Sequence, residues 1–413
     1  MLTINTQRLL DDLHALSQIG RTPEGGVSRP ALSEADLEAR AWFRQRAEAA
    51  RLAFRQDGAA NVSAVLPAED PAARTLLAGS HLDSVPDGGR YDGALGTLCA
   101  LEALRAIKEA GLRLPLHLEA IAFTDEEGTL VGLLGSRALA GLLTADDLAR
   151  PRGGQEALAA GMRRAGITPE SILAARRPPE SLAAFVEVHI EQGTRLEAQQ
   201  AAIGVVTAIV GIRSFWLRFS GQAAHAGTTP LDRRADALWG AADFVGRARA
   251  LVEERFSPGV VNCGQLVVRP GAFNIVPGEA RLALEFRHST DEQLDGMEAA
   301  LLEAAQATAQ AHGLELAVEA ASHTTPTPLH EGVIRAIEGA ADALRLPHTR
   351  LVSFAGHDTQ AMSAVIPSAM FFVPSVGGIS HSPREYTRDE DVINAGNVLL
   401  HTLLALAGTS DSR

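Results

Sequence analysis

The chain has 413 residues, of which 46% are hydrophobic and 21% charged, so it is expected to fold around a substantial core and not to be disordered. Its net charge of −13 argues against nucleic-acid binding, because contact with phosphates requires a basic surface. The longest apolar stretch, 201–211, is shorter than the roughly 20 residues that a membrane helix needs, so no membrane partner is expected. The N-terminus shows no signal-peptide pattern, and two cysteines cannot form a disulfide framework or a thiolate metal site. We therefore expect a cytoplasmic protein.

Short apolar runs alternate with helical patterns through the first half of the chain and again near its end. Helical spacing is seen over 34–52 and 94–110, and the apolar runs, which predict strands, are 76–78, 118–123, 185–188 and 369–373. Strands that alternate with helices in this way indicate βαβ units. The pattern predicts an α/β domain with a mostly parallel sheet that is covered on both faces.

The stretch 211–321 has a different pattern. Apolar and polar residues alternate over 215–219, 281–286 and 314–318, which predicts half-buried strands. Between the last two lies a helix with a capping box at its start and Gly313 at its end; its apolar face and cap are formed by Leu294, Met297, Leu301, Ala304, Thr290 and Gln293. We therefore expect a small α+β sandwich at 211–321, inserted into a larger, discontinuous domain made of 1–210 and 322–413.

Polar side chains that can carry chemistry follow each of the four apolar runs of the larger domain. They are His81 after the first run, Glu126 and Glu127 after the second, His189 after the third, and His381 after the fourth, through a Gly-rich loop. In open α/β sheets the binding crevice lies at the carboxyl ends of the strands. We therefore expect these side chains to meet there.

Imidazole and carboxylate are the groups with which proteins hold zinc or manganese in open catalytic sites. Asp92 can join them, because the turn at 86–89 can fold the chain back toward His81. One carboxylate that bridges two ions, with two further ligands on each, accounts for five residues: His81, Asp92, Glu127, His189 and His381. Such a pair of ions holds a water and polarises a carbonyl, and the remaining acid, Glu126, would then act as general base. The mixed set accepts zinc, manganese or cobalt.

Each of these residues also has an ordinary interpretation. A single histidine after a strand is more often a loop or cap residue than a ligand, and Asp92 before Gly93 is also a typical turn residue. The pair Glu126–Glu127 is compatible with a solvated helix start near the positive end of the dipole. The coincidence of four clusters at four predicted strand ends favours a metal site.

Five motifs, in this order, carry a resemblance to a known family: GSHLDSVPDGGRYDG (79–93), DEEG, HIEQG, GQAAHAGTTP and SHSP. They resemble the dimetal amidohydrolases of the N-carbamoyl-L-amino-acid hydrolase, allantoate amidohydrolase and β-ureidopropionase group, which are relatives of aminoacylase and carboxypeptidase-type zinc peptidases. The resemblance spans almost the whole chain. It implies a zinc-peptidase-like catalytic domain with an inserted dimerisation, or lid, domain. It places His81 and His189 on one metal, Glu127 and His381 on the other, and Asp92 between them.

The same resemblance assigns roles outside the ligand set. Glu126 would be the general base, and Asp83 would orient His81. The inserted domain would form a homodimer and lend residues to the partner's active site. His225 would support the oxyanion, although it could be only a turn histidine bonded by Thr228 or Thr229. The substrate-binding residues would be Asn274 and Arg287 for the carboxylate, Gln192 for the ureido group, and His357 in the same pocket. Without the family, Arg287 would be interpreted as a strand arginine in a surface ion pair.

The chain departs from the family pattern at several positions. Phe354 stands where Gly is common, Glu285 where Asp is usual, Ala224 where Asn is usual, and 129–131 replaces a frequent Arg-Phe pair. None of these departures removes a ligand, so they bear on the substrate. We expect a homodimeric enzyme that hydrolyses the carbamoyl C–N bond of an N-carbamoyl-L-amino acid. The alternatives are an allantoate amidohydrolase, then a β-ureidopropionase, then an N-acyl amino acid hydrolase. A catalytically silent scaffold is the alternative from a different class, and it predicts loss of ligands or base, all of which are present.

Overall fold

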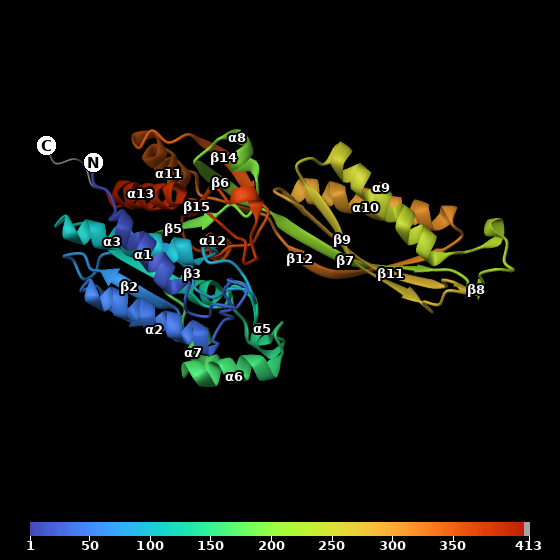
Figure 1. Cartoon of the computed structure of the whole chain (residues 1–413), viewed down its shortest axis with the longest axis horizontal. Coiled ribbons are helices and arrows are strands. Elements are labelled where there is room, and N and C mark those ends of the chain that lie inside the picture. Colours follow the sequence, from blue (N-terminus) through green and yellow to red (C-terminus); the bar gives the residue numbers. More distant parts are fainter. Residues whose placement is uncertain (409–413) are drawn as a thin grey trace. The chain divides into compact units, whose positions relative to one another are not determined.

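The computed structural model describes residues 1–408, which form two compact units (Figure 1). The first unit comprises Met1–Thr207, Leu329–Leu351 and the chain from Gly356 onward. The second comprises Ala208–Pro328 and Val352–Ala355, and the predicted insertion at 211–321 lies within it. No helix among the described residues is long and apolar enough to cross a membrane.

The larger sheet is mixed and has the strand order β1-β2-β4-β3-β5-β15-β6-β13, with β14 paired to β6. Most of it belongs to the first unit, whereas β13 and the last residues of β6 and β14 belong to the second. The adjacent strands β4, β3, β5 and β15 are parallel, and each contains one of the four predicted apolar runs. The α/β class with a mostly parallel central sheet is therefore confirmed. The strands are β1 (Ala53–Gln56), β2 (Val62–Leu66), β3 (Thr75–His81), β4 (His117–Phe123), β5 (Leu182–Ile190), β6 (Ile203–Ile209), β13 (Thr327–Pro328), β14 (His348–Ser353) and β15 (Ser368–Val373).

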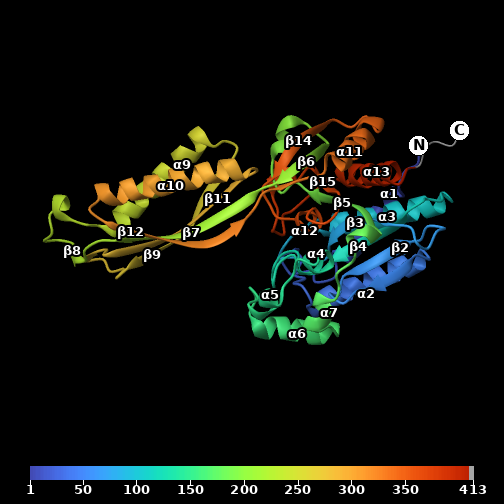
Figure 2. The same ribbon diagram turned by 180° about the vertical axis from the view of Figure 1, so that it is seen from behind.

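Helices cover the central strands of this sheet. Helix α3 packs on β3, β4 and β5, with α13 against it, and Figure 2 shows α2 running beside β2. Leu77 and Phe185 belong to a core cluster with α4 and α12, while their neighbours Leu76 and Val186 are also buried. Burial of successive residues explains why these strands appear in the sequence as continuous apolar runs. The helices are α1 (Thr6–Leu16), α2 (Glu34–Ala49), α3 (Ala94–Glu109), α4 (Leu134–Ala140), α5 (Ala145–Ala149), α6 (Gln155–Ala165), α7 (Pro169–Leu173), α8 (Arg195–Gln199), α11 (Glu331–Ala343), α12 (Asp358–Met362) and α13 (Asp389–Leu406).

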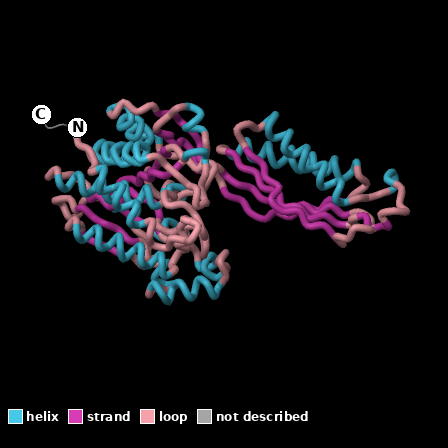
Figure 3. Tube along the Cα trace, viewed as in Figure 1, coloured by secondary structure: helices cyan, strands magenta, loops and turns pink. Residues whose placement is uncertain are grey.

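The second unit is an antiparallel sheet of order β12-β7-β11-β9 against which α9 and α10 pack, and Figure 3 shows helices along one face of it. Phe215, Leu217 and Phe219 of β7 are buried against these helices, as the alternating pattern predicted. Helix α10 begins after Thr290, whose side chain accepts a hydrogen bond from the backbone N–H of Gln293. The elements are β7 (Gly211–Ser220), β8 (Ala224–His225), α9 (Ala237–Arg255), β9 (Val260–Arg269), β10 (Ile275–Val276), β11 (Glu279–His288), α10 (Asp291–Ala311) and β12 (Glu315–Thr324).

Candidate metal centre

The candidate ligands stand at the carboxyl ends of the parallel strands of the first unit. His81 is the last residue of β3, and His189 is the last but one of β5. Glu127 follows the end of β4, and His381 follows β15 through a loop. Asp92 lies in the loop before α3. Because these strands are neighbours and parallel, their ends bring the five side chains to one edge of the sheet.

The five side chains form two groups that share Asp92. The ligand atoms of His81, Asp92 and His189 lie within 4.8 Å of one another, and so do those of Asp92, Glu127 and His381. Oδ1 of Asp92 is 3.0 Å from Nε2 of His189 and 3.4 Å from Nε2 of His81. Oδ2 is 3.4 Å from Nε2 of His381, which is in turn 3.3 Å from Oε2 of Glu127. The first group is buried, whereas the side chain of His381 is 50% exposed.

Two backbone carbonyls determine which ring nitrogens of the buried histidines face Asp92. Nδ1 of His81 lies 2.9 Å from the carbonyl oxygen of Asp83, and Nδ1 of His189 lies 3.0 Å from that of Ile190. A carbonyl can only accept, so each Nδ1 carries a proton and donates. In the neutral ring, Nε2 then presents its lone pair to the centre, as a metal ligand requires.

The donor groups fit a divalent cation. Nε2 of His81 is buried and has no hydrogen-bond partner, although it faces the carboxylates of Asp92 and Glu126. Burial alone would lower the pKa of His81, but Glu126 and Asp92 raise it well above the ordinary value. Contacts with Asp92 and Glu127 raise the pKa of His381 to about 10. Imidazole nitrogens held this closely by carboxylates can share either a proton or a metal ion, and the set accepts zinc, manganese and cobalt alike.

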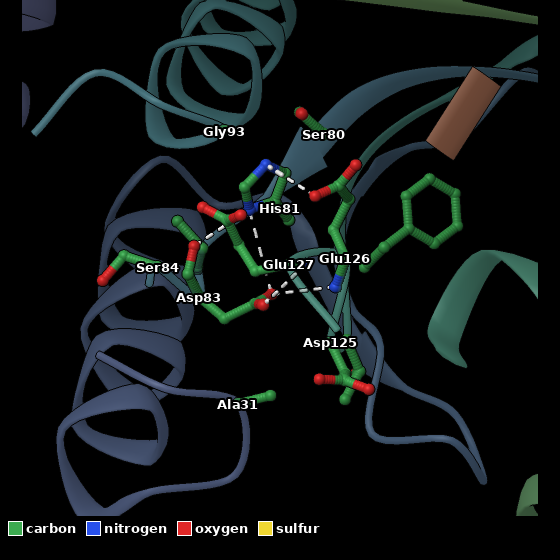
Figure 4. A network of polar contacts seen from close by, with 12 residues as sticks. Ala31, Ser80, His81, Asp83, Ser84, Gly93, Asp125, Glu126 and Glu127 are labelled. Atoms are coloured by element: carbon green, nitrogen blue, oxygen red, sulfur yellow. Dashed lines mark hydrogen bonds and ion pairs between the residues drawn. The ribbon is translucent and has the colours of Figure 1, made fainter. Parts of the chain in front are cut away.

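Glu126 belongs to neither group, and Figure 4 shows its side chain beside His81. Its Oε2 is 3.7 Å from Nε2 of His81, and its side chain is 10% exposed. Burial raises the pKa of Glu126 well above its ordinary range; the nearby acids Asp358 and Glu127 raise it further, and His81 opposes them. A carboxylate with a raised pKa is suited to take up and return a proton near neutral pH.

Asp83 touches the centre in a way that the motif did not indicate. Its carboxylate accepts hydrogen bonds from the backbone N–H groups of Glu126, at 3.4 Å, and Glu127, at 3.3 Å. Its Oδ1 is 3.9 Å from Nδ1 of His81, which is held instead by the Asp83 backbone carbonyl. Asp83 therefore joins the His81 loop to the turn that carries the two glutamates, as Figure 4 shows.

The sequence analysis missed buried acids near the centre, among them Asp125 and Glu187. Asp125, at φ 57°, accepts hydrogen bonds from the backbone N–H groups of residues 130–132 and so shapes the loop after Glu126 and Glu127. Glu187 accepts from the hydroxyl of Ser80 and from the backbone N–H and hydroxyl of Thr359. Glu187 could have been noticed in the sequence, because it is a charged residue within an otherwise apolar strand.

Gln192 and His357, the two substrate-binding candidates of the first unit, lie at the centre. Nε2 of Gln192 donates to Oδ2 of Asp92 at 2.8 Å. The ring of His357 is buried with its centroid 4.6 Å from that of His189. Burial, with the charge of His189, lowers the pKa of His357 well below its ordinary value.

His225 and Asn274, which belong to the second unit, lie close together. β8 pairs with β10, and the carbonyl of Asn274 accepts from the backbone N–H of Ala226 at 3.0 Å. Nδ1 of His225 accepts from the backbone N–H groups of Gly227 and Thr228. That is the turn contact of the ordinary interpretation, and it leaves the proton of the neutral ring on Nε2 as a donor.

Arg287 is held by two of the residues at which the chain departs from the family pattern. Its Nε and Nη2 donate to Oε1 of Glu285 at 2.9 and 2.8 Å. Its Nη1 donates to the backbone carbonyl of Phe354 at 2.6 Å. The side chain of Arg287 is 31% exposed, so it is an ion-paired strand arginine that can still meet a ligand.

Comparison with known proteins identifies relatives over the whole length of the chain. The family model described as Peptidase family M20/M25/M40 matches residues 77–405. An N-carbamoyl-L-amino acid amidohydrolase from Geobacillus stearothermophilus is 35% identical over 98% of this chain and 99% of its own. An allantoate amidohydrolase from Escherichia coli (strain K12) is 30% identical over 98% of this chain and 99% of its own. The crystal structure of a hydantoinase/carbamoylase family amidase from Burkholderia ambifaria is 34% identical, with a TM-score of 0.92 over 99% of both chains. The resemblance that the motifs indicated is confirmed.

Proposed function

The chain belongs to peptidase family M20/M25/M40, and we propose that within this family it hydrolyses the carbamoyl C–N bond of an N-carbamoyl-L-amino acid. The products are the free amino acid and carbamate, which decomposes to ammonia and carbon dioxide. The observation that carries the proposal is the pair of donor groups that share Asp92, with Glu126 beside them and outside both. A bridging carboxylate with an adjacent free carboxylate is the arrangement that two-metal hydrolysis requires.

The residues that would hold two divalent ions are His81 and His189 on one side of Asp92 and Glu127 and His381 on the other. When bound, the ions supply Lewis acidity, which activates water and polarises the carbamoyl oxygen. Zinc, manganese and cobalt all suit these donors.

The side chains then divide the reaction between proton transfer and charge stabilisation. Glu126 accepts the proton of the water that attacks the carbamoyl carbon. It returns that proton to the amine nitrogen as the C–N bond breaks, so one carboxylate serves as base and then as acid. The Nε2–H of His225 supports the oxygen on which negative charge develops. Gln192 and His357 bind the ureido end of the substrate.

Arg287 and Asn274 are proposed to bind the substrate carboxylate. A guanidinium suits this task because it can donate to both oxygens at once, and the donor groups of the first unit offer no other cation than imidazolium. Glu285 and Phe354 fix the orientation of Arg287 and therefore influence which carboxylate-bearing substrates fit.

We place this enzyme in the cytoplasm as a homodimer whose active sites each use residues of both chains. The edge strands of the second-unit sheet carry exposed apolar side chains that a partner would cover, namely Val260, Leu266 and Val267 on β9 and Val318 on β12. The two cysteines are unpaired, which suits a reducing compartment.

An assay of ammonia release tests the proposed substrate. Purified protein loaded with Zn²⁺, Mn²⁺ or Co²⁺ is offered N-carbamoyl-L-methionine, allantoate and 3-ureidopropionate in parallel. We expect the largest kcat/KM with the first. Preference for allantoate would assign the chain to the activity of its Escherichia coli relative, and no turnover of any substrate by a metal-loaded protein would indicate a silent scaffold.

A further inference from the structure

Glu385 lies in the loop that follows His381, and its carboxylate is buried, with the residue 4% exposed. Oε1 accepts hydrogen bonds from the backbone N–H groups of Tyr91, at 2.9 Å, and Asp92, at 3.2 Å. Oε2 lies 2.9 Å from Oγ of Ser380, the residue before His381. One carboxylate therefore ties the loop that presents Asp92 to the loop that presents His381, two segments 293 residues apart in the chain.

The Asp92 loop is shaped to admit this carboxylate. A Cβ atom on Gly89 would overlap the carboxyl group of Glu385. Glycine is therefore needed at position 89 for space, and Gly89 and Glu385 fit each other across two distant segments. The contact can therefore be tested by a substitution at Gly89 as well as by one at Glu385.

The second donor group (Asp92, Glu127 and His381) depends on such support more than the first does. In the first group, His81 and His189 are buried and each Nδ1 is held by a backbone carbonyl. Within residues 1–408, no carbonyl holds the ring of His381 in this way. His381 is half exposed and has φ 52°, a left-handed backbone conformation that is unfavourable for a residue with a side chain. Its position must therefore be imposed by the loop around it.

We propose that Glu385 is a positioning residue that holds Ser380 and His381 against Asp92 and so builds the second donor group. Ser380 carries the connection further, because its Oγ also lies 3.1 Å from Oδ2 of Asp92, the oxygen that faces His381. The first group keeps its own support, since the Nδ1 atoms of His81 and His189 are held by the backbone carbonyls of Asp83 and Ile190 and not by Glu385 or Ser380. This assignment rests on the metal centre of the proposed function.

A titration of the metal-free, full-length protein with Co²⁺ tests the proposal, with calorimetry for affinity and the cobalt absorption spectrum for coordination. The variants are Glu385→Gln, Glu385→Ala and Gly89→Ala, and Glu390→Gln, an exposed glutamate in the first turn of α13, is the matched control. We expect the wild type and the control to bind two ions per chain. In the three variants the second ion should bind about 10–100-fold more weakly, the usual effect of removing a group that orients a ligand. The affinity for the first ion and its absorption band should not change.

Each other outcome contradicts a defined part of the argument. If the variants bind both ions as tightly as the wild type does, or bind both ions more weakly to the same extent, the positioning role of Glu385 is wrong, while the metal centre of the proposed function stands. A wild type that binds fewer than two ions would contradict the metal centre itself, and the assignment with it. If Glu385→Ala does not fold, Glu385→Gln decides, because it keeps the volume of the side chain.

Discussion

Replacement of Glu126 by Gln separates proton transfer from metal binding at this centre. Gln has the same size and shape as Glu, and the carboxylate of Glu126 belongs to neither donor group, so the substitution should leave both groups intact. What it removes is a carboxylate outside those groups whose oxygen lies 3.7 Å from Nε2 of His81. We therefore expect Glu126→Gln to keep its metal content and its Tm.

The expected loss is in kcat. A positioned general base or acid contributes typically about 10²–10⁴-fold to the rate. Because each factor of ten corresponds to about 1.4 kcal/mol, this is about 3–5 kcal/mol of transition-state free energy. Glu126 is not proposed to bind the substrate, so KM should stay near the wild-type value. Ammonia release from N-carbamoyl-L-methionine measures the kinetics, and elemental analysis of the same preparation measures the metal.

Glu127→Gln is the matched comparison, because it makes the same exchange of one carboxylate oxygen for an amide NH2 group in the neighbouring side chain. It removes one of the three ligands of the second donor group, so metal content should fall together with activity. If Glu126→Gln loses metal while Glu127→Gln keeps it, the roles of base and ligand are reversed and our reading of the centre is wrong.

Four further predictions test other parts of the structure. Asp92→Ala should empty both metal positions, since both groups use Asp92, and normal occupancy by elemental analysis would remove it from the bridge. Homodimers of Arg287→Ala and of Glu126→Gln should each be nearly inactive. If each active site uses residues of both chains, a heterodimer of the two variants has one site with both substitutions and one with neither, and it should recover up to half of the wild-type activity. No recovery would mean that Arg287 serves the site of its own chain. Asp125→Asn should lower the free energy of unfolding in urea by about 2–4 kcal/mol, because a buried charged acceptor of three backbone N–H groups is lost, and an unchanged midpoint would contradict this. Burial raises the pKa of Asp391 to about 6 in the folded protein, above the ordinary 3.8, so its negative charge destabilises the fold above about pH 6. The contribution of Asp391 to the free energy of unfolding should therefore become more favourable as the pH falls from about 6 to about 4. Asp391→Asn should remove this contribution, and identical profiles of unfolding free energy against pH for the two proteins would refute it.

The central strands and the ligands could be predicted from the sequence for the same physical reason. Strands buried on both faces appear as continuous apolar runs, and the parallel direction of these strands places whatever follows them at one edge of the sheet. His81 and His189 were found in this way, because each stands at the end of such a run. The peripheral strands, such as β1 and β14, are short and only partly buried, so they leave no comparable pattern.

The residues that hold the ligands in place could not be predicted, because their roles depend on contacts between distant segments. Glu385 receives hydrogen bonds from residues almost 300 positions earlier in the chain, and Glu187 receives them from Ser80 and Thr359. Nothing near Glu385 in the sequence distinguishes it from an ordinary loop glutamate. Asp83 shows the same limit at short range: the motif indicated that it acts at the centre, but only the structure shows that its carboxylate binds the turn of the two glutamates.

The buried carboxylates around the centre differ in the partners that surround them. A charge removed from water costs several kcal/mol unless protein groups solvate or pair it. Asp83, Asp125 and Glu187 are solvated by backbone N–H and hydroxyl donors, and such a carboxylate could bind a proton or a cation only by giving up those bonds. Asp92 faces imidazoles with both oxygens, so a divalent ion can take the place of the protons it shares with them. Glu126 has no backbone donor to its carboxylate among residues 1–408 and only the distant contact with His81, so its carboxylate can accept a proton and release it again without giving up such bonds.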